Sequence, residues 1–223
     1  MDLPDRLPSA IIPVLGALAA IGVAAWVLAV VLRRRRIARL KRWGAEHGFT
    51  YYEWDDRLTW LSSAYPFNAR REYGHHVFHG RRHGRYIIFG EHHGHEGRQG
   101  RKHQLVAVQL PAECPFLDIS QETVGSRMAA VFGVRDLQLE SQAFNDHFKI
   151  DTATDRFAYD ILTPRVMSWL LDDERGRVLP WRIEDDWLLT WRYGRFDESD
   201  ALLYLRFLFD LFDRVPDYLW RDG

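Results

Sequence analysis

The chain has 223 residues and a net charge of −1, and it contains nine Trp, nine Tyr and thirteen Phe. So many large apolar side chains can form a packed core, which excludes an intrinsically disordered chain. The single cysteine, Cys114, excludes an intrachain disulfide and agrees with a reducing cytoplasm.

The small net charge hides two oppositely charged halves. Residues 33–110 carry 16 Lys or Arg against 7 Asp or Glu, whereas residues 111–223 carry 13 against 22. A nucleic-acid-binding domain presents a basic surface, so the acidic half argues against a nucleic-acid partner. The basic half is the part that an anionic membrane surface would attract.

The first predicted element is a membrane-spanning helix over residues 10–32. These 23 residues carry no charge, and Arg33 to Arg36 follow directly. A helix of this length rises about 35 Å, enough to cross a hydrocarbon core about 30 Å thick. One alternative is a cleaved signal peptide, which the long apolar run and the four arginines disfavour. The other is a buried helix of a soluble protein.

The charges beside the span predict its orientation. Residues 33–42 contain seven Lys or Arg and no acid, whereas residues 1–9 contain two Asp and one Arg. Positive flanks stay in the cytoplasm. We therefore expect a single-pass protein of the cell (plasma) membrane, with residues 1–9 as a short tail outside and the C-terminal domain in the cytoplasm.

The basic segment continues as a helix over residues 33–48, because Ile37, Leu40 and Trp43 recur on one face. Its long cationic side chains can reach the headgroups while the helix lies at the bilayer surface. The cytoplasmic domain would then cover residues 49–223. The side chains expected to contact lipid headgroups are Arg33, Arg34, Arg35, Arg36, Arg39, Lys41 and Arg42.

The next part of the chain favours β structure, because it is rich in β-branched and aromatic residues. The four glycines of residues 90–100 predict a hairpin loop, and Pro111 and Pro115 mark the exit from the last strand. The predicted strands cover residues 49–54, 72–80, 86–89 and 104–110.

Further along, the pattern alternates between helix and strand. Thr163 followed by Pro164 is typical of a helix cap and first turn. That helix ends near Asp172, where an acidic run begins. The other elements expected here are a helix over residues 121–132 and short strands over residues 136–140 and 144–150. A hairpin over residues 178–183 and 187–193 would turn at Glu184, Asp185 and Asp186.

The last helix begins at a cap, Asp197 or Ser199, and ends by Pro216. Its apolar face is wide enough to need a sheet beneath it. The chain therefore predicts an α+β fold: an N-terminal transmembrane helix followed by a mainly antiparallel sheet domain packed by a C-terminal amphipathic helix. The apolar face consists of Leu202, Leu205, Phe209 and Phe212, widened by Leu203, Phe207, Leu208 and Leu211.

Several short motifs between residues 139 and 171 carry a resemblance to a known family. They are Leu139-Glu140-Ser141, Phe144-Asn145, Phe148, Asp155-Arg156-Phe157-Ala158 and the run from Leu162 to Leu171. On these residues the chain resembles a family of single-span, membrane-anchored proteins, common in actinobacteria, that carry a domain of unknown function. The resemblance covers roughly residues 10–220. It implies a basic flank, a β-rich middle and a terminal helix running into Pro216 and Trp220. It implies no reaction and no catalytic residues, and the histidine-rich segment is not part of it.

Eight of the ten histidines lie in residues 75–103. His92, His93 and His95 could hold a metal ion together with the neighbouring Glu91 and Glu96. Their spacing matches no closed zinc site, and a mobile glycine-rich loop would lose entropy on binding. We therefore expect a solvated polar loop and no bound metal or other cofactor. Another interpretation is a pH sensor, in which crowding near arginines lowers the imidazole pKa values.

Other catalytic chemistry finds little support in the sequence. Cys114 has no evident base or helix N-terminus beside it, so we expect an ordinary half-buried thiol. Ser141 lacks the glycine-flanked nucleophile elbow and is better explained as a turn or cap residue. The acidic runs 172–174 and 184–186 are expected to be solvated turns, and the phosphate-binding glycine motifs are absent from the sequence.

Taken together, these patterns favour a membrane-tethered cytoplasmic binding or scaffold module that is not an enzyme. Its expected partners are the lipid bilayer and another membrane protein, because tethering raises the effective concentration of a neighbour. The alternative is a metal-dependent enzyme or metal-binding protein that uses residues 75–103.

Overall fold

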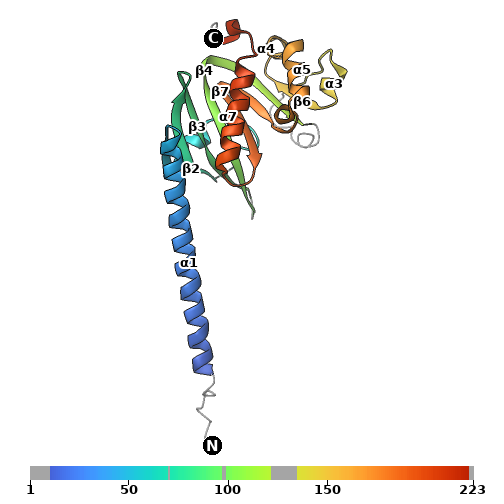
Figure 1. Ribbon diagram of the computed structural model, residues 1–223. Coiled ribbons are helices and arrows are strands. Elements are labelled where there is room, and N and C mark those ends of the chain that lie inside the picture. Colours follow the sequence, from blue (N-terminus) through green and yellow to red (C-terminus); the bar gives the residue numbers. More distant parts are fainter. Residues whose placement is uncertain (1–10, 70, 97–98, 122–134, 221–223) are drawn as a thin grey trace, which may run out of the picture. The chain divides into compact units, whose positions relative to one another are not determined.

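The computed structural model describes residues 11–69, 71–96, 99–121 and 135–220 (Figure 1). The chain divides into two compact units, Met1–Trp43 and Gly44–Gly223. The first is helical and the second is a sheet domain. The expected outer tail, residues 1–9, lies outside the described residues.

The helix α1 (Ile11–Glu46) is continuous. The two helices expected over residues 10–32 and 33–48 are therefore one. It ends two residues before Gly48, which has a positive φ of 79°. From Val14 onward α1 is long and apolar enough to cross a membrane. None of its most apolar stretch is buried. A core helix of a soluble protein would be mostly buried, so that alternative does not fit.

Seven strands of the described residues form one sheet, in the order β1-β2-β3-β4-β6-β5, with β7 also paired to β4. Every pairing is antiparallel, which confirms the predicted fold class. The strands are β1 (Phe49–Trp54), β2 (Arg71–Arg82), β3 (Arg85–Glu96), β4 (Gln99–Gln121), β5 (Arg135–Asp136), β6 (Phe148–Thr152) and β7 (Trp181–Tyr193).

The two faces of the sheet bury different parts of the chain. Ile88 and Phe89 are neighbours in β3 and so point to opposite faces. Phe89 stacks on Phe196, just before the helix α7 (Glu198–Phe212), which packs on β4 and β7. Ile88 joins a cluster under the short helix η1 (Asp56–Trp60) and the segment after it. That cluster consists of Leu58, Leu61, Phe67, Val77, Ile88, Leu105, Ala107, Leu189 and Trp191.

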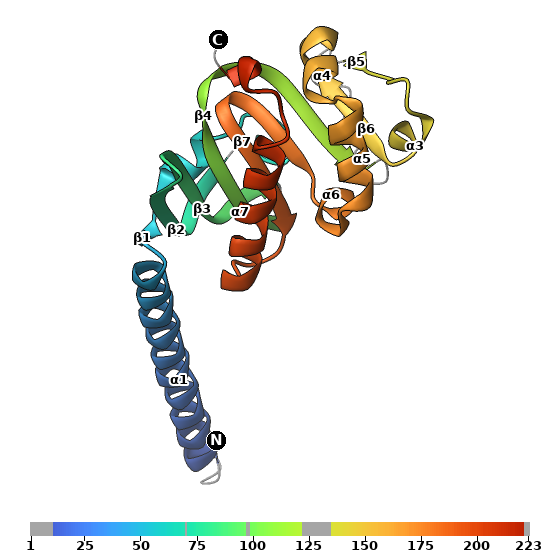
Figure 2. The ribbon, with the colours of Figure 1, turned by 45° about the horizontal axis from the view of Figure 1, so that its top comes forward.

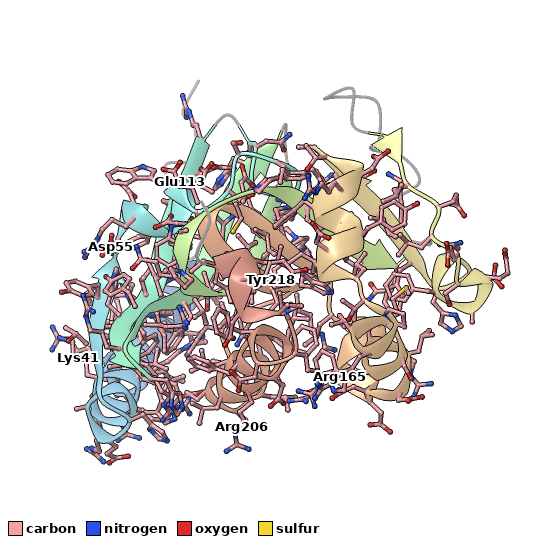
Figure 3. All side chains as sticks on the ribbon, turned by 90° about the horizontal axis from the view of Figure 1, so that it is seen from above. Lys41, Asp55, Glu113, Arg165, Arg206 and Tyr218 are labelled. Atoms are coloured by element: carbon pink, nitrogen blue, oxygen red, sulfur yellow. The ribbon has the colours of Figure 1, made fainter. Side chains whose placement is uncertain are left out.

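The helix α7 begins as predicted, because Asp197 caps it by accepting from the backbone N–H groups of Ser199 and Asp200. Its buried face is turned slightly from the predicted one: Leu203 is 42% exposed, whereas Phe207 is buried and stacks on Trp169. The helix is therefore held between the sheet and its helical neighbours, and Arg206 points outward (Figure 3).

The short helices α3 to α6 lie on the side of the sheet that carries β6 (Figure 2), whereas η2 contacts β4. The cap Thr163 and first-turn Pro164 are confirmed, and the helix that they begin ends at Asp172 as expected. The chain does not become irregular there, because Asp173 caps a further short helix. The elements are α3 (Gln142–Asn145), α4 (Asp155–Ile161), α5 (Pro164–Asp172), α6 (Glu174–Val178) and η2 (Asp217–Trp220).

The hairpin loop expected over residues 90–100 is wrong. Strand β3 continues to Glu96 and β4 begins at Gln99, so the histidine-rich stretch is paired sheet. Gly90 serves close packing, because a Cβ there would lie 2.9 Å from the carbonyl oxygen of His76. The glycines were therefore misleading as turn signals.

Two further turn predictions are wrong for a shared reason. Strand β4 continues past Pro111 and Pro115, where the strand was expected to end. Strand β7 is continuous through Asp185, where a hairpin turn was expected. The register between the two strands shifts on either side of the pair Cys114 and Asp185, and Asp185 has a φ of 53°. A β-bulge therefore accommodates both the prolines and the acidic run.

The middle of the chain is described only in part. The helix expected over residues 121–132 lies outside the described residues apart from Gln121, which ends β4. Only Asp136 of the strand expected over residues 136–140 is in β5. Of the strand expected over residues 144–150, Phe144 lies in α3 and only residues from Phe148 onward are in β6.

Candidate functional site

The histidines of β2 and β3 are divided between the two faces of the sheet. His75 is the direct cross-strand partner of Glu91, and His92 is the partner of His103. Since side chains alternate along a strand, His93 lies on the same face as Glu91 and His92 on the other. The three candidates from the sequence, His92, His93 and His95, therefore do not converge on one site.

The structure brings together a different set, namely His75, Glu91 and His93. One potential ligand atom from each lies within 4.8 Å of the others. His93 Nε2 is 2.9 Å from Glu91 Oε2, and His75 Nδ1 is 3.8 Å from the same oxygen. The side chains of Glu91 and His93 are only 3% and 6% exposed, and that of His75 is 18% exposed.

Aromatic rings and a backbone donor hold this set in place. Tyr73 stacks on His93 with ring centroids 4.6 Å apart, and Trp54 lies against His75 at 4.2 Å. The backbone N–H of Phe196 donates to Glu91 Oε1 at 3.1 Å. That hydrogen bond fixes the carboxylate so that its other oxygen faces the two imidazoles.

On the opposite face, His92 and His103 lie in a mostly apolar environment. His92 is fully buried against Phe67, and its Nε2 is 3.6 Å from a carboxylate oxygen of Glu72. His103 also packs against Phe67. Burial is the main cause that lowers the pKa of His103 to about 4, with smaller contributions from the neighbouring His92 and Arg101. The lowered pKa expected from the sequence is therefore found at His103, although its main cause is desolvation and not crowding near arginines.

His79 belongs to a second polar group, which fastens η1 to the sheet. Its Nε2 is 3.0 Å from Asp55 Oδ2, and its Nδ1 hydrogen-bonds the hydroxyl of Tyr86. Asp55 caps η1 and accepts hydrogen bonds from both Nε and Nη2 of Arg57 (Asp55 is labelled in Figure 3). Burial lowers the pKa of His79 and raises that of Tyr86, so both side chains are held neutral.

The other sequence candidates have structural roles. Burial raises the pKa of the Cys114 thiol to about 11, so the reactive thiolate is disfavoured. Ser141 caps α3 by accepting from the backbone N–H of Phe144, as predicted. His95 is exposed near the end of β3, close to the backbone of Gly100.

The two acidic runs are not solvated turns. Glu184 accepts hydrogen bonds from the hydroxyls of Ser62 and Ser63 and from the backbone N–H of Ser63. Asp173 accepts from Nε and Nη2 of Arg175, which holds the pKa of Asp173 below its usual range. Glu184 therefore joins β7 to the segment after η1, and Arg175, which Asp173 holds, also donates to Asp210 of α7.

Sequence reasoning missed one buried charge altogether. Arg182 is 3% exposed and hydrogen-bonds Asp118, the Ser62 hydroxyl and the backbone carbonyl of Tyr65. Its guanidinium also lies over the ring of Trp191, 4.8 Å from the centroid. The alternation of β7 could have placed Arg182 on a buried face. The residues near Arg182 in the sequence, however, give no sign of its distant partners.

The basic stretch of α1 presents most of its side chains on the helix surface. Arg33, Arg34 and Arg35 are exposed, and Arg36 is half-buried. Further along the same helix, Arg39, Lys41 and Arg42 are also exposed. All seven cationic residues expected to contact headgroups thus lie on one unbroken helix directly after its apolar part.

The features described so far define a class: an antiparallel sheet domain preceded by one helix long and apolar enough to cross a membrane. No family model matches the chain, and no curated protein matches it either. Among solved structures, its fold is similar to that of the crystal structure of the mycobacterial trehalose monomycolate transport factor A, TtfA. The TM-score is 0.62 at 14% sequence identity, and the match covers 80% of this chain and 95% of that one. At this identity the likeness is one of fold alone.

Proposed function

We propose that the chain is a membrane-tethered, non-catalytic factor that assists the transport of an envelope lipid by binding a membrane protein. The observation that carries the proposal is the continuity of α1: its apolar part is unburied, and it runs on as a helix until three residues before β1. A folded domain joined so closely to a span stays within reach of neighbouring membrane proteins. Modest affinity is then sufficient for association.

The charge of α1 supports the orientation of the tether. Seven cationic residues follow the apolar part, and each attracts an anionic membrane surface by about 1 kcal/mol. We infer that the apolar segment spans the cell membrane once and that the sheet domain lies on the cytoplasmic side. The side chains of Arg33 to Arg36, Arg39, Lys41 and Arg42 would contact the headgroups.

The transport role rests on the fold. The similar solved structure is described as a trehalose monomycolate transport factor, and it shares most of its length with this chain. The raised pKa of Cys114, the helix cap made by Ser141 and the hydrogen bonds accepted by Glu184 support a role without covalent catalysis. We therefore infer that the sheet domain works by contact, and that a lipid transporter of the same membrane is its partner.

The proposal is tested by depletion and rescue in the protein's own cell. The readout is the distribution of newly labelled envelope glycolipid between the inner membrane and the cell surface. Depletion is expected to hold the lipid at the inner membrane, and the wild-type chain is expected to restore export. The paired substitutions Ile21→Asp and Leu28→Arg place charges in the apolar part of α1, where each costs about 3 kcal/mol on insertion. This variant is expected to fail.

A matched control carries Ile21→Leu and Leu28→Ile, which keep the helix apolar and are expected to rescue fully. In parallel, cross-linking of the wild-type chain should capture an integral membrane protein that the charged variant does not capture. Normal glycolipid export after depletion would overturn the transport role, and rescue by the charged variant would overturn the tether.

A further inference from the structure

We propose that His75, Glu91 and His93 bind a divalent transition-metal ion, and that zinc is the ion favoured by this donor set. The inference goes beyond the transport role and does not depend on it. Two imidazoles and one carboxylate are ligands that zinc commonly uses, and the fourth position is left for water.

The strand register explains why these three residues meet. His75 of β2 stands directly opposite Glu91 of β3. Residues directly opposite in antiparallel strands have Cβ atoms about 5 Å apart. His93 follows Glu91 by two positions and so projects from the same face. The set therefore combines a cross-strand pair with an alternate-residue pair, which rigid strands hold without a mobile loop.

The distances leave room for an ion after a small adjustment. Zinc ligands lie about 2.0–2.2 Å from the metal, which puts tetrahedral donor atoms about 3.3–3.6 Å apart. His75 Nδ1 and Glu91 Oε2 are 3.8 Å apart, and His93 Nε2 and Glu91 Oε2 are 2.9 Å apart. Side-chain rotations of a few tenths of an ångström would adjust both separations, and the ligand atoms of the two imidazoles, which lie within 4.8 Å of each other, would move closer together.

The surroundings fit a site whose ligands are oriented in advance. The Phe196 N–H holds Glu91 Oε1, which leaves Oε2 directed at the imidazoles. Tyr73 and Trp54 pack against the rings of His93 and His75. Such outer contacts fix ligand orientation in metal sites. The partial exposure of His75 gives an ion access to an otherwise buried set.

A buried carboxylate also needs compensation for its lost hydration. A bound cation would supply part of that compensation at Glu91. The proposal therefore predicts saturable zinc binding that depends on both histidines. Because the site would join β2 to β3, bound zinc should also raise the resistance of the fold to unfolding.

The test uses the full chain in detergent micelles, purified through a tag without histidine and stripped with a chelator. Isothermal titration with zinc chloride is expected to give one saturable equivalent, and the thermal midpoint should rise with zinc. Cobalt(II) is expected to give visible absorption bands that show a low-coordinate site. His93→Gln and His75→Gln should each weaken zinc binding at least 10-fold and abolish those bands.

The matched control is His95→Gln, which changes an exposed histidine of the same strand and should leave zinc binding unchanged. The metal-free melting curve of each variant reports folding separately, and the partly exposed His75 makes His75→Gln the safer variant. No saturable zinc binding to the folded wild-type chain would overturn the proposal. So would a loss with His95→Gln equal to that with His93→Gln, since that result would favour the set His92, His93 and His95 instead.

Discussion

Arg182 of β7 donates from Nε to Asp118 Oδ1 of β4 at 2.7 Å, and both residues are buried cross-strand partners. The same guanidinium donates from Nη1 to the Ser62 hydroxyl at 2.6 Å and from Nη2 to the Tyr65 carbonyl at 2.6 Å. One side chain therefore holds together the paired strands β4 and β7 and the segment that covers one face of the sheet.

The first prediction concerns this pair. Arg182→Met leaves Asp118 buried without its ion-pair partner, which should lower the free energy of unfolding by about 3–5 kcal/mol. Urea unfolding of the detergent-solubilised protein measures the change. Arg192→Met is the control, because Arg192 is 67% exposed and 3.8 Å from Asp200, and such a pair contributes under about 1 kcal/mol. Equal losses in the two variants would show that Arg182 has no special role.

A second prediction follows from the close approach of β2 to η1. A Cβ on Gly74 would lie 2.1 Å from the carbonyl oxygen of Asp55, a backbone atom that cannot simply rotate away. Gly74→Ala should therefore cost about 3 kcal/mol or more in unfolding free energy. At Gly100 the nearest atom would be 3.5 Å away, so Gly100→Ala should change stability by under about 1 kcal/mol. Unfolding curves that coincide for the two variants would contradict this account of the packing.

The third prediction is an acid sensitivity centred on His103. Its pKa is lowered from 6.5 to about 4, chiefly by burial, so the folded chain favours neutral imidazole. The stabilisation is complete above pH 6.5 and is lost as the pH falls toward 4, because the unfolded chain takes up the proton first. Between neutral pH and pH 5 the loss should be about 2 kcal/mol. Urea unfolding at the two pH values measures it.

His103→Leu should reduce that pH dependence, because leucine fills the same site beside Phe67 without a titratable group. His147→Gln is a suitable comparison, because His147 is exposed. The assignment to His103 fails if the leucine variant retains the full acid sensitivity of the wild-type chain.

The fourth prediction tests the orientation of the tether. Arg33, Arg34, Arg35 and Arg36 carry most of the positive charge directly beside the apolar part of α1. Replacing all four with Gln weakens the charge bias that sets orientation, so a mixture of topologies is expected. Protease added outside intact spheroplasts should spare the wild-type sheet domain and cut a fraction of the variant. Cleavage of the wild-type domain from outside would mean that the proposed orientation is reversed.

Periodicity was sufficient for the fold class, because alternating strands and one wide apolar helix leave few other packings. Sequence patterns failed where a residue type that is common in turns has another structural role. Gly90 and Asp185 carry turn chemistry in sequence, but one allows close backbone approach and the other sits in a bulge. Only the pairing of distant strands distinguishes these uses from a turn.

The histidine set shows the same limit. Consecutive His92 and His93 attracted attention in the sequence, yet neighbours in a strand point to opposite faces. The alternation from Glu91 to His93 was a usable signal, but it depended on recognising a strand where glycines suggested a loop. The third member, His75, could not be assigned without the register that pairs β2 with β3.

The proposed tether requires that the apolar part of α1 is embedded in a membrane, and sequential extraction measures this. Cell membranes carrying the full-length protein are washed with high salt, then with alkaline carbonate, and finally with detergent, and the intact mass is followed by immunoblot. The full-length chain is expected to stay in the pellet through both washes and to be released only by detergent. Release by either wash, or a mature chain shortened by removal of its apolar segment, would contradict it.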